Sequence, residues 1–229
     1  MSNWYEVAVA SQRAEADGLT HLELDVAATP LAGTHLHAGQ YVKLALEGLG
    51  ESFFALASPP GPHAARFEVL VKAGAPLADA LTQLKPGAQV RATVAQGKGF
   101  PLAAARGKNV LLVATGSGLS PVRSAIEAML AERGAYGELT VYVGARTPQA
   151  FAYADRMTHW ERAGVRVFRV VSQPGQSGWK GLTGYVQGHL TPPAPPAVAF
   201  LCGQKAMVQA VTETLVARGV GRDAIFLNF

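Results

Sequence analysis

The sequence predicts two architectures in one chain: a six-stranded antiparallel β barrel followed by an α/β domain built on a parallel sheet. Three observations carry this prediction. Short segments of alternating apolar and polar residues fill the first half, whereas continuous apolar runs alternate with helical stripes in the second. A glycine-rich turn stands between the first such run and its helix. We expect the domains to be residues 1–104 and 105–229, with the boundary within 102–108.

The barrel strands follow from period-two alternation bounded by Gly, Pro or Asp turns. A short helix is expected between the fifth and sixth strands, because leucines recur at helical spacing over residues 75–84 after Pro76 and before Pro86. The six expected strands are residues 5–10, 20–26, 41–46, 53–57, 66–72 and 89–94.

The second half alternates strands with helices, the pattern of a parallel sheet covered on both faces. The expected strands are 110–114, 139–143, 165–171, 198–201 and 224–229, and the expected helices are 121–133, 148–162 and 205–218. The proline-rich segment 191–196 is interpreted as a stiff loop that enters a strand.

Composition narrows the class of protein. With 49% hydrophobic and 16% charged residues over 229 positions, the chain is not disordered, and its apolar runs are too short to span a membrane. A single cysteine excludes an internal disulfide, and no targeting signal is recognised at the start, so we expect a cytoplasmic or other reducing compartment.

Positive charge is concentrated in the second half. Residues 1–104 carry 7 Lys and Arg against 9 Asp and Glu, a net charge of −2, whereas residues 105–229 carry 13 against 7, a net charge of +6. Because the arginines are scattered rather than clustered, they indicate a small anionic ligand or ordinary solvated side chains, and we expect no nucleic acid or membrane partner.

The strongest local motif is residues 113–121, VATGSGLSP, at the end of a buried strand and the start of a helix. Glycines allow the backbone to approach a diphosphate, and the free N–H groups at a helix start favour its charge. Hydroxyls of Thr115 or Ser120 are candidate additional donors. The spacing differs from G-x-G-x-x-G, so the turn alone is also compatible with a plain strand-to-helix connection.

An arginine follows the second expected strand of the second half, residues 139–143. In dinucleotide-binding sheets the residue at this place contacts a ribose and distinguishes NAD from NADP. An acidic residue there favours the 2′-hydroxyl of NAD, whereas an arginine accommodates the 2′-phosphate of NADP. Arg146 therefore favours NADP. Thr147 and Tyr153 are candidate hydroxyl contacts, and Arg156 is a second candidate charge or a solvated side chain.

Two further groups are weighed for chemistry. Cys202-Gly203 ends a strand at the carboxyl edge, where ligands of open parallel sheets bind, although a lone cysteine in an apolar strand is also typical of packing. His35 and His37 point to one side if they lie in a strand, but without a third ligand we interpret them as surface histidines and expect no metal.

Taken in order, these motifs resemble the ferredoxin-NADP reductase superfamily. The resemblance rests on residues 38–42 (AGQYV), 115–121 (TGSGLSP), 144–147 (GART), Cys202-Gly203 and the terminal aromatic, and it covers nearly the whole chain. It implies a flavin, FAD, held by the barrel, a nicotinamide coenzyme held by the second domain, and an electron-transfer reductase with an unknown acceptor. The implied sites are Thr115, Gly116, Gly118 and Pro121 for the diphosphate, beside the candidate donor Ser120, then Cys202 and Gly203 beside the nicotinamide and Phe229 over the flavin. A Phe that ends an apolar strand is equally typical of a core edge.

The flavin motifs depart from the family pattern. Where the family has Arg-x-Tyr-Ser and a later Ser, the chain has Ser52, Phe54, Ala55 and then Ser58, and residues 73–78 (AGAPLA) lack the hydroxyl of the second motif. Losing an arginine and two or three hydroxyls removes about 4 to 6 kcal/mol, a thousandfold or more in affinity. Phe54 can still stack on a flavin ring, and the helix after Gly74 is expected to offer backbone donors.

Three functional hypotheses follow. The first is a reductase-like oxidoreductase that binds NAD(P)H and transfers hydride or electrons through weakly held FAD. The second is a flavin-less nucleotide-binding or scaffold protein that kept the fold. The third is a subunit that passes electrons to a redox protein partner docked on the basic second half.

Overall fold

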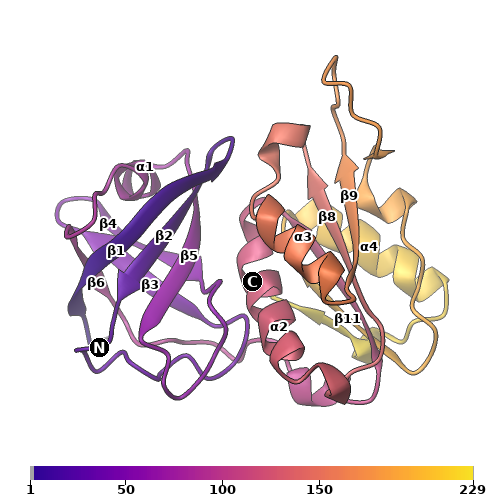
Figure 1. Cartoon of the computed structure of the whole chain (residues 1–229), viewed down its shortest axis with the longest axis horizontal. Helices are drawn as coiled ribbons and strands as arrows, with labels where there is room; N and C mark the ends of the chain where they lie inside the picture. Colours follow the sequence, from indigo (N-terminus) through magenta and orange to yellow (C-terminus); the bar gives the residue numbers. More distant parts are fainter. Residues whose placement is uncertain (1–2, 229) are drawn as a thin grey trace.

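Two six-stranded sheets lie side by side in the computed structural model, which describes residues 3–228 (Figure 1). The first sheet is formed by strands β1–β6 and the second by β7–β12, so the two predicted architectures are confirmed. Phe229, the predicted flavin-covering aromatic, lies outside the described residues. Within residues 3–228, no helix has the length and apolar content needed to cross a membrane.

The first sheet is antiparallel throughout, with strand order β4-β3-β6-β1-β2-β5. Its edges, β4 and β5, meet only through an isolated bridge between Leu56 and Val69, so the sheet is barrel-like without continuous closure. The strands are β1 (Tyr5–Ala16), β2 (Leu19–Asp25), β3 (Tyr41–Leu46), β4 (Gly50–Ala55), β5 (Arg66–Lys72) and β6 (Gln89–Ala92). β1 extends six residues beyond its predicted end because residues 11–16 pair with β2.

Alternation explains the interior of this barrel. In β5, Phe67, Val69 and Val71 are buried in the same core cluster, as the period of two requires. The helix α1 (Pro76–Thr82) covers one end with Leu77, Ala78 and Leu81, and it begins at Pro76 as predicted.

The second sheet is parallel, with strand order β10-β9-β8-β7-β11-β12. Its strands are β7 (Asn109–Thr115), β8 (Leu139–Ala145), β9 (Arg166–Val171), β10 (Leu182–Thr183), β11 (Ala197–Cys202) and β12 (Ile225–Leu227). Its helices are α2 (Leu119–Ala131), α3 (Ala154–Arg162) and α4 (Lys205–Ala217). Short 3-10 turns occupy Leu102–Ala105, Gly116–Gly118, Arg133–Ala135, Pro148–Ala150, Val186–Gly188 and Arg222–Ala224.

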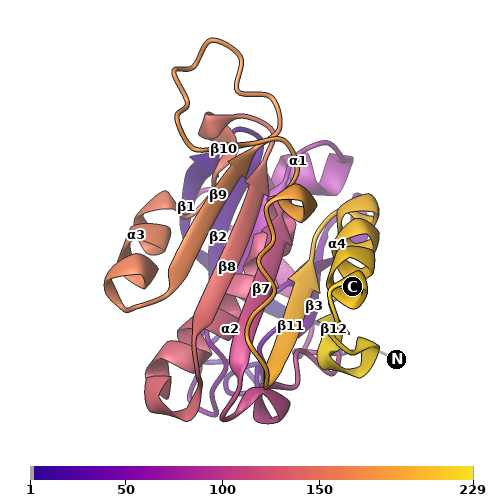
Figure 2. The same ribbon diagram turned by 90° about the vertical axis from the view of Figure 1, so that its right-hand side faces the viewer.

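Both faces of the parallel sheet are covered. Along β7, Val110, Leu112 and Ala114 join the cluster that contains α2 and α3, whereas Leu111 and Val113 join the cluster that contains α4. Figure 2 shows α3 and α4 on opposite sides of the strands. This explains why these strands are continuously apolar instead of alternating.

The third predicted helix starts later than its sequence pattern indicates. Residues 148–162 were expected to form one helix, but the α-helix begins at Ala154, after the left-handed backbone of Tyr153 (φ +58°). The two-residue strand β10 was not predicted, since two residues are too short for a periodic signal.

The two sheets share a buried interface formed mainly by α2. Figure 1 places α2 between the barrel and the parallel sheet. Phe100, which follows the barrel, packs on Phe200 of β11 with ring centroids 4.9 Å apart. Ala38, Ala57 and Leu70 of the first half belong to the same apolar cluster as α2. The domain boundary at 104/105 stays a prediction.

The prediction of two surface histidines is wrong for His35. Residues 34–36 form an irregular segment rather than a strand, and they leave His37 exposed while His35 is fully buried. Neither ring nitrogen of His35 has a hydrogen-bond partner, and burial lowers the pKa of His35 to about 4. No three His, Cys, Asp or Glu side chains of the described residues gather closely enough to hold a metal ion.

We predict that His35 makes the protein sensitive to mild acid. The pKa of His35 lies below the ordinary 6.5 in the folded protein. Between about pH 4 and 6.5, His35 is therefore protonated in the unfolded chain and neutral in the folded one. The stabilising contribution of neutral His35 is complete above this window and is lost as the pH falls through it, at about 1.4 kcal/mol per pH unit. Urea unfolding from pH 4.5 to 7.5 should show a shallower decline in His35→Leu, with exposed His63→Leu as the control. Equal slopes for the native protein and His35→Leu would contradict the prediction.

Candidate functional site

A cavity of about 800 Å³ opens between the barrel and the parallel sheet. Its walls come from both halves of the chain, and they include most of the predicted diphosphate turn. The barrel wall consists of Tyr41, Ser52, Phe53, Phe54, Ala55, Leu70, Lys72, Ala75, Leu77 and Ala78. The opposite wall consists of Thr115, Gly116, Ser117, Gly118, Ser120, Pro121, Cys202, Gly203, Gln204 and Asn228.

The glycine-rich turn lies directly against the end of β11. A Cβ added to Gly118 would lie 2.5 Å from the Cys202 carbonyl oxygen and 2.7 Å from the Gly203 amide nitrogen, so only glycine permits this approach. Gly116 has a left-handed backbone (φ +56°) and faces open space. Among the described residues no side chain caps the 3-10 turn Gly116–Gly118 that leads into α2, and the amides of this turn are the candidate donors to an anion. The first α2 amide, that of Leu119, already donates to the Gly116 and Ser117 carbonyls, and Pro121 has no N–H.

The two hydroxyls of the turn already have structural partners. Thr115 Oγ1 accepts a hydrogen bond from the Gln204 amide (3.1 Å), which joins the ends of β7 and β11. Ser120 Oγ accepts a hydrogen bond from the Leu70 amide of β5 (3.1 Å) and is almost fully buried. Both residues line the cavity, but Ser120 also fixes the start of α2 to the barrel.

Cys202 ends β11 at the cavity wall, beside Gly203. Burial raises the pKa of the Cys202 thiol to about 12, so the group stays protonated at neutral pH and lacks the nucleophilic thiolate form. Gly203 is also required sterically, since a Cβ there would overlap the Thr115 hydroxyl. The arrangement therefore offers a narrow, uncharged edge for a flat ring.

Arg146 and Thr147 lie beyond the cavity, after β8. The exposed Arg146 donates from Nε to Gln173 Oε1 (2.8 Å), and the Gln173 amide donates to the Arg146 carbonyl (2.8 Å). These contacts hold the guanidinium near the carboxyl edge of the sheet and leave its terminal nitrogens free.

Tyr153 does not belong to the ribose site that the sequence indicated. Its hydroxyl is buried at 3.1 Å from His21 Nδ1 of the barrel. Arg156 lies 3.9 Å from Glu127 and is half exposed, as a solvated side chain is expected to be.

The barrel wall supplies aromatic and small side chains. Phe54 lines the cavity, whereas Ser58 does not: Ser58 is buried, and its hydroxyl accepts a hydrogen bond from the Glu68 amide (3.3 Å). Gly74 is also absent from the lining, and its amide donates to Asp79 Oδ1 (2.8 Å). The Gly74 amide is therefore already used. The expected donors at the start of the helix after Gly74 stay a prediction: no side chain caps α1 among the described residues, and Ala75, Leu77 and Ala78 line the cavity.

Sequence reasoning missed several lining residues, among them Tyr41, Lys72 and Asn228. Asn228 reaches the cavity because its side-chain amide donates to the Gly39 carbonyl (2.8 Å), 189 residues earlier in the chain. Lys72 is the last residue of β5, a strand whose bounds were predicted correctly. Its place at a strand end was the signal that could have identified it.

The two predicted ligands fit this site to different degrees. The glycine turn, with open space at Gly116 and uncapped amides, fits the diphosphate of a nicotinamide dinucleotide. Phe54 and Tyr41 fit a planar flavin ring, but Ala55 and Ala78 offer no side-chain hydrogen bond to the rest of a flavin. Fold and site together define a nucleotide-binding oxidoreductase.

Comparison with known proteins gives the family. A family described as "Oxidoreductase NAD-binding domain" matches residues 112–213. The chain is 32% identical over 234 residues to "Fruit protein pKIWI502" of Actinidia deliciosa, covering 94% of this chain and 73% of that protein. It is 33% identical over 199 residues to "Ferredoxin--NADP reductase B" of Sorangium cellulosum, covering 80% and 79%.

A similar solved structure is the ferredoxin NADP+ reductase of Neisseria gonorrhoeae with bound FAD and NADP. The TM-score is 0.80 at 18% identity, and the match covers 99% of this chain and 98% of that one. The chain belongs to the ferredoxin-NADP reductase-like family of FAD- and NAD(P)-binding oxidoreductases.

We predict that Gly118→Ala lowers nicotinamide-coenzyme affinity by at least about tenfold, because the new Cβ must displace the backbone of Cys202 and Gly203. Calorimetric titration with NADP+ measures the effect. Gly134→Ala is the matched control, since nothing lies within 4 Å of its Cβ position. Unchanged affinity in a folded Gly118→Ala protein would show that the turn does not contribute to coenzyme binding.

Proposed function

We propose that the chain transfers hydride or electrons between NAD(P)H and an acceptor through a flavin placed in the cavity. One observation carries the proposal: an uncapped glycine-rich turn and an aromatic wall face one another across a single cavity. Anion-binding amides on one side and ring-stacking side chains on the other are what two stacked nucleotide cofactors require.

The coenzyme contacts come from the parallel-sheet half. The amides of the turn hold the diphosphate, with Thr115, Gly116, Gly118, Ser120 and Pro121 shaping its path. Cys202 and Gly203 set the edge on which the nicotinamide lies, and the protonated thiol of Cys202 packs against it without accepting a proton.

The flavin contacts come from the barrel. Phe54 provides a face for the ring, and its position in β4 is fixed by antiparallel pairing with Val42. A flavin bound there supplies the chemistry, since it accepts a hydride from a dihydronicotinamide and releases electrons to an acceptor. The chain's own contribution is to bring the two rings together.

Arg146 gives the coenzyme preference. Its terminal guanidinium nitrogens, held in place through Nε by Gln173, can receive a 2′-phosphate, and Thr147 adds a neighbouring hydroxyl. NADP is therefore the proposed coenzyme. A redox protein such as a ferredoxin, after which the Sorangium relative is named, is the proposed class of acceptor.

A second function, nucleotide binding without flavin, is favoured by the barrel wall. Ser52, Phe54, Ala55 and Ala78 line the cavity where polar contacts to a flavin would be made. A protein of this kind would bind the coenzyme and carry no electrons.

We predict that the purified protein carries substoichiometric FAD or none, and that Ser52→Arg with Ala55→Ser raises FAD affinity by at least about tenfold. The visible spectrum before and after dialysis, followed by FAD titration, measures both. Gln83→Arg adds the same charge outside the cavity and should change nothing. A yellow, stoichiometric protein after extensive dialysis would contradict this prediction.

We predict that Arg146→Ala weakens NADP+ binding by about 10-fold or more while leaving NAD+ binding unchanged, because one charge-assisted contact to the 2′-phosphate is lost. Calorimetry with both coenzymes measures it. Arg166→Ala removes an exposed arginine from the opposite end of the parallel strands and serves as the control. Equal affinity for both coenzymes, insensitive to Arg146→Ala, would remove the NADP assignment.

A further inference from the structure

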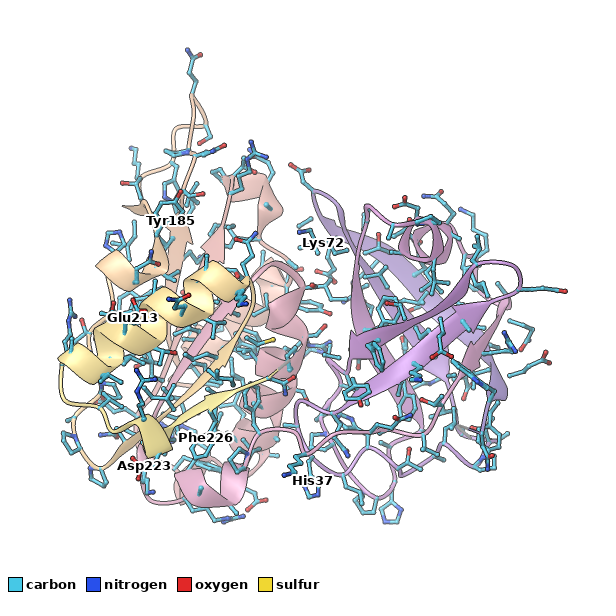
Figure 3. All side chains as sticks on the ribbon, turned by 180° about the vertical axis from the view of Figure 1, so that it is seen from behind. His37, Lys72, Tyr185, Glu213, Asp223 and Phe226 are labelled. Atoms are coloured by element: carbon cyan, nitrogen blue, oxygen red, sulfur yellow. The ribbon has the colours of Figure 1, made fainter. Side chains whose placement is uncertain are left out.

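The hairpin formed by β1 and β2 belongs to the barrel, but its end contacts the other half of the chain. Figure 1 shows this end, in indigo, on the side of the barrel that faces the parallel sheet. Figure 3 shows Lys72, the register partner of Leu19 on β5, on the same side. Ala16 and Leu19 pair across the turn and pack with the apolar cluster that contains α2 and α3. The end of the hairpin is therefore part of the interface between the two halves.

We propose that Glu15 of this hairpin is a positioning residue for coenzyme selection. It fixes residues 147–153, the segment between Arg146 and α3, and thereby the place of the Arg146 guanidinium. The inference rests on the proposed preference for NADP, and it identifies what holds the arginine that reads the 2′-phosphate.

Two backbone hydrogen bonds join the segment to the hairpin. The Tyr153 amide donates to Glu15 Oε2 (2.9 Å), and the Asp17 amide donates to the Gln149 carbonyl (3.3 Å). Among the described residues, these are the only hydrogen bonds that the backbone of residues 147–153 makes outside its own turn and α3. The hairpin therefore supplies the backbone support that the segment receives from elsewhere in the chain.

The Glu15 carboxylate is well placed as an acceptor. Its Oε1 pairs with Arg13 at 2.6 Å, and its Oε2 accepts from the Tyr153 amide. Only 10% of the Glu15 side chain is exposed, so water competes little for the carboxylate. A hydrogen bond from an amide to a carboxylate is stronger than one to a neutral oxygen.

Tyr153 needs this support because its backbone is left-handed (φ +58°), a conformation that bulky side chains rarely adopt. Such a backbone persists only where its surroundings determine it. Here the amide is held by Glu15, and the side-chain hydroxyl contacts His21 Nδ1 of the same hairpin. Without the Glu15 acceptor, the Tyr153 amide loses its partner and the backbone relaxes toward an ordinary conformation, which shifts the segment that leads back to Arg146.

Arg146 depends on this segment because its other restraint is weak. Its Nε donates to Gln173, an exposed residue, so water competes for that bond. Glu15 acts on the 2′-phosphate side of the coenzyme site and makes no contact with the turn Gly116–Gly118. Its loss should therefore weaken binding of NADP+ and spare NAD+, which has no 2′-phosphate. A purely structural residue would change both affinities or neither.

Calorimetric titration of the purified protein with NADP+ and NAD+ tests the proposal. Glu15→Ala should lower NADP+ affinity about fivefold to tenfold and leave NAD+ affinity unchanged. In the Arg146→Ala background, Glu15→Ala should have no further effect, because both substitutions remove one contact. Glu15→Gln keeps an acceptor for the Tyr153 amide and should stay within about twofold of the native protein.

Glu23→Ala is the matched control. It removes a carboxylate of the same hairpin whose partners, Ser11 and Arg66, both lie in the barrel, so both affinities should be unchanged. If Glu15→Ala does not fold, Glu15→Asp keeps the charge but withdraws the acceptor by one methylene, and it should show the same loss confined to NADP+.

The outcomes separate this inference from the proposed function. An undiminished NADP+ preference in folded Glu15→Ala or Glu15→Asp, equal losses for both coenzymes, or additive effects with Arg146→Ala overturn the positioning role and leave the proposed reductase intact. Equal binding of the two coenzymes by the native protein overturns the NADP assignment and the positioning role together. Failure of both coenzymes to bind overturns the proposed function itself.

Discussion

The buried ion pair between Arg123 of α2 and Glu68 of β5 determines how the two halves face each other. The Arg123 guanidinium nitrogen lies 2.5 Å from the Glu68 carboxylate, and only 3% of Arg123 is exposed. The same guanidinium lies 4.7 Å from the centre of the Tyr153 ring. Removing one partner while the other stays buried costs several kcal/mol, so the pair favours this one arrangement of the two halves.

His21 completes this cluster as a neutral group. Burial, with the positive charges of Arg13 and Arg123, lowers the pKa of His21 to about 3, while burial raises the pKa of Tyr153. The protonated Tyr153 hydroxyl therefore donates to His21 Nδ1. Together with the bond between Ser120 and Leu70, the cluster fixes α2 against β5, and the glycine turn at the start of α2 consequently opens toward the barrel wall.

The sequence predicted the fold well because periodicity reports burial locally. The alternation in β5 and the apolar run in β7 gave strands within one residue of their observed ends. The glycine turn was recognisable because its chemistry lies within a few consecutive residues.

Arg123 could not be recognised, since a helix arginine is ordinarily solvated and its partner Glu68 is 55 positions away. Tyr153 was misjudged for the same reason, as its partner His21 lies 132 residues earlier. Lys72 is the one charged residue among the described residues that line the cavity, and this could not be recognised because the cavity wall is assembled from segments far apart in the sequence.

The hydrogen bond from Asn228 to the Gly39 carbonyl spans almost the whole chain, and it has a consequence for biosynthesis. A growing polypeptide can complete the barrel strands long before Asn228 has left the ribosome, because those strands pair among residues 5–92. Until then, the Gly39 carbonyl is hydrogen-bonded to water. The last part of the cavity wall, at Asn228, forms only when β12 pairs with the edge of the parallel sheet. Ligand binding therefore requires residues near position 228, and a nascent chain can form the barrel before it forms the site.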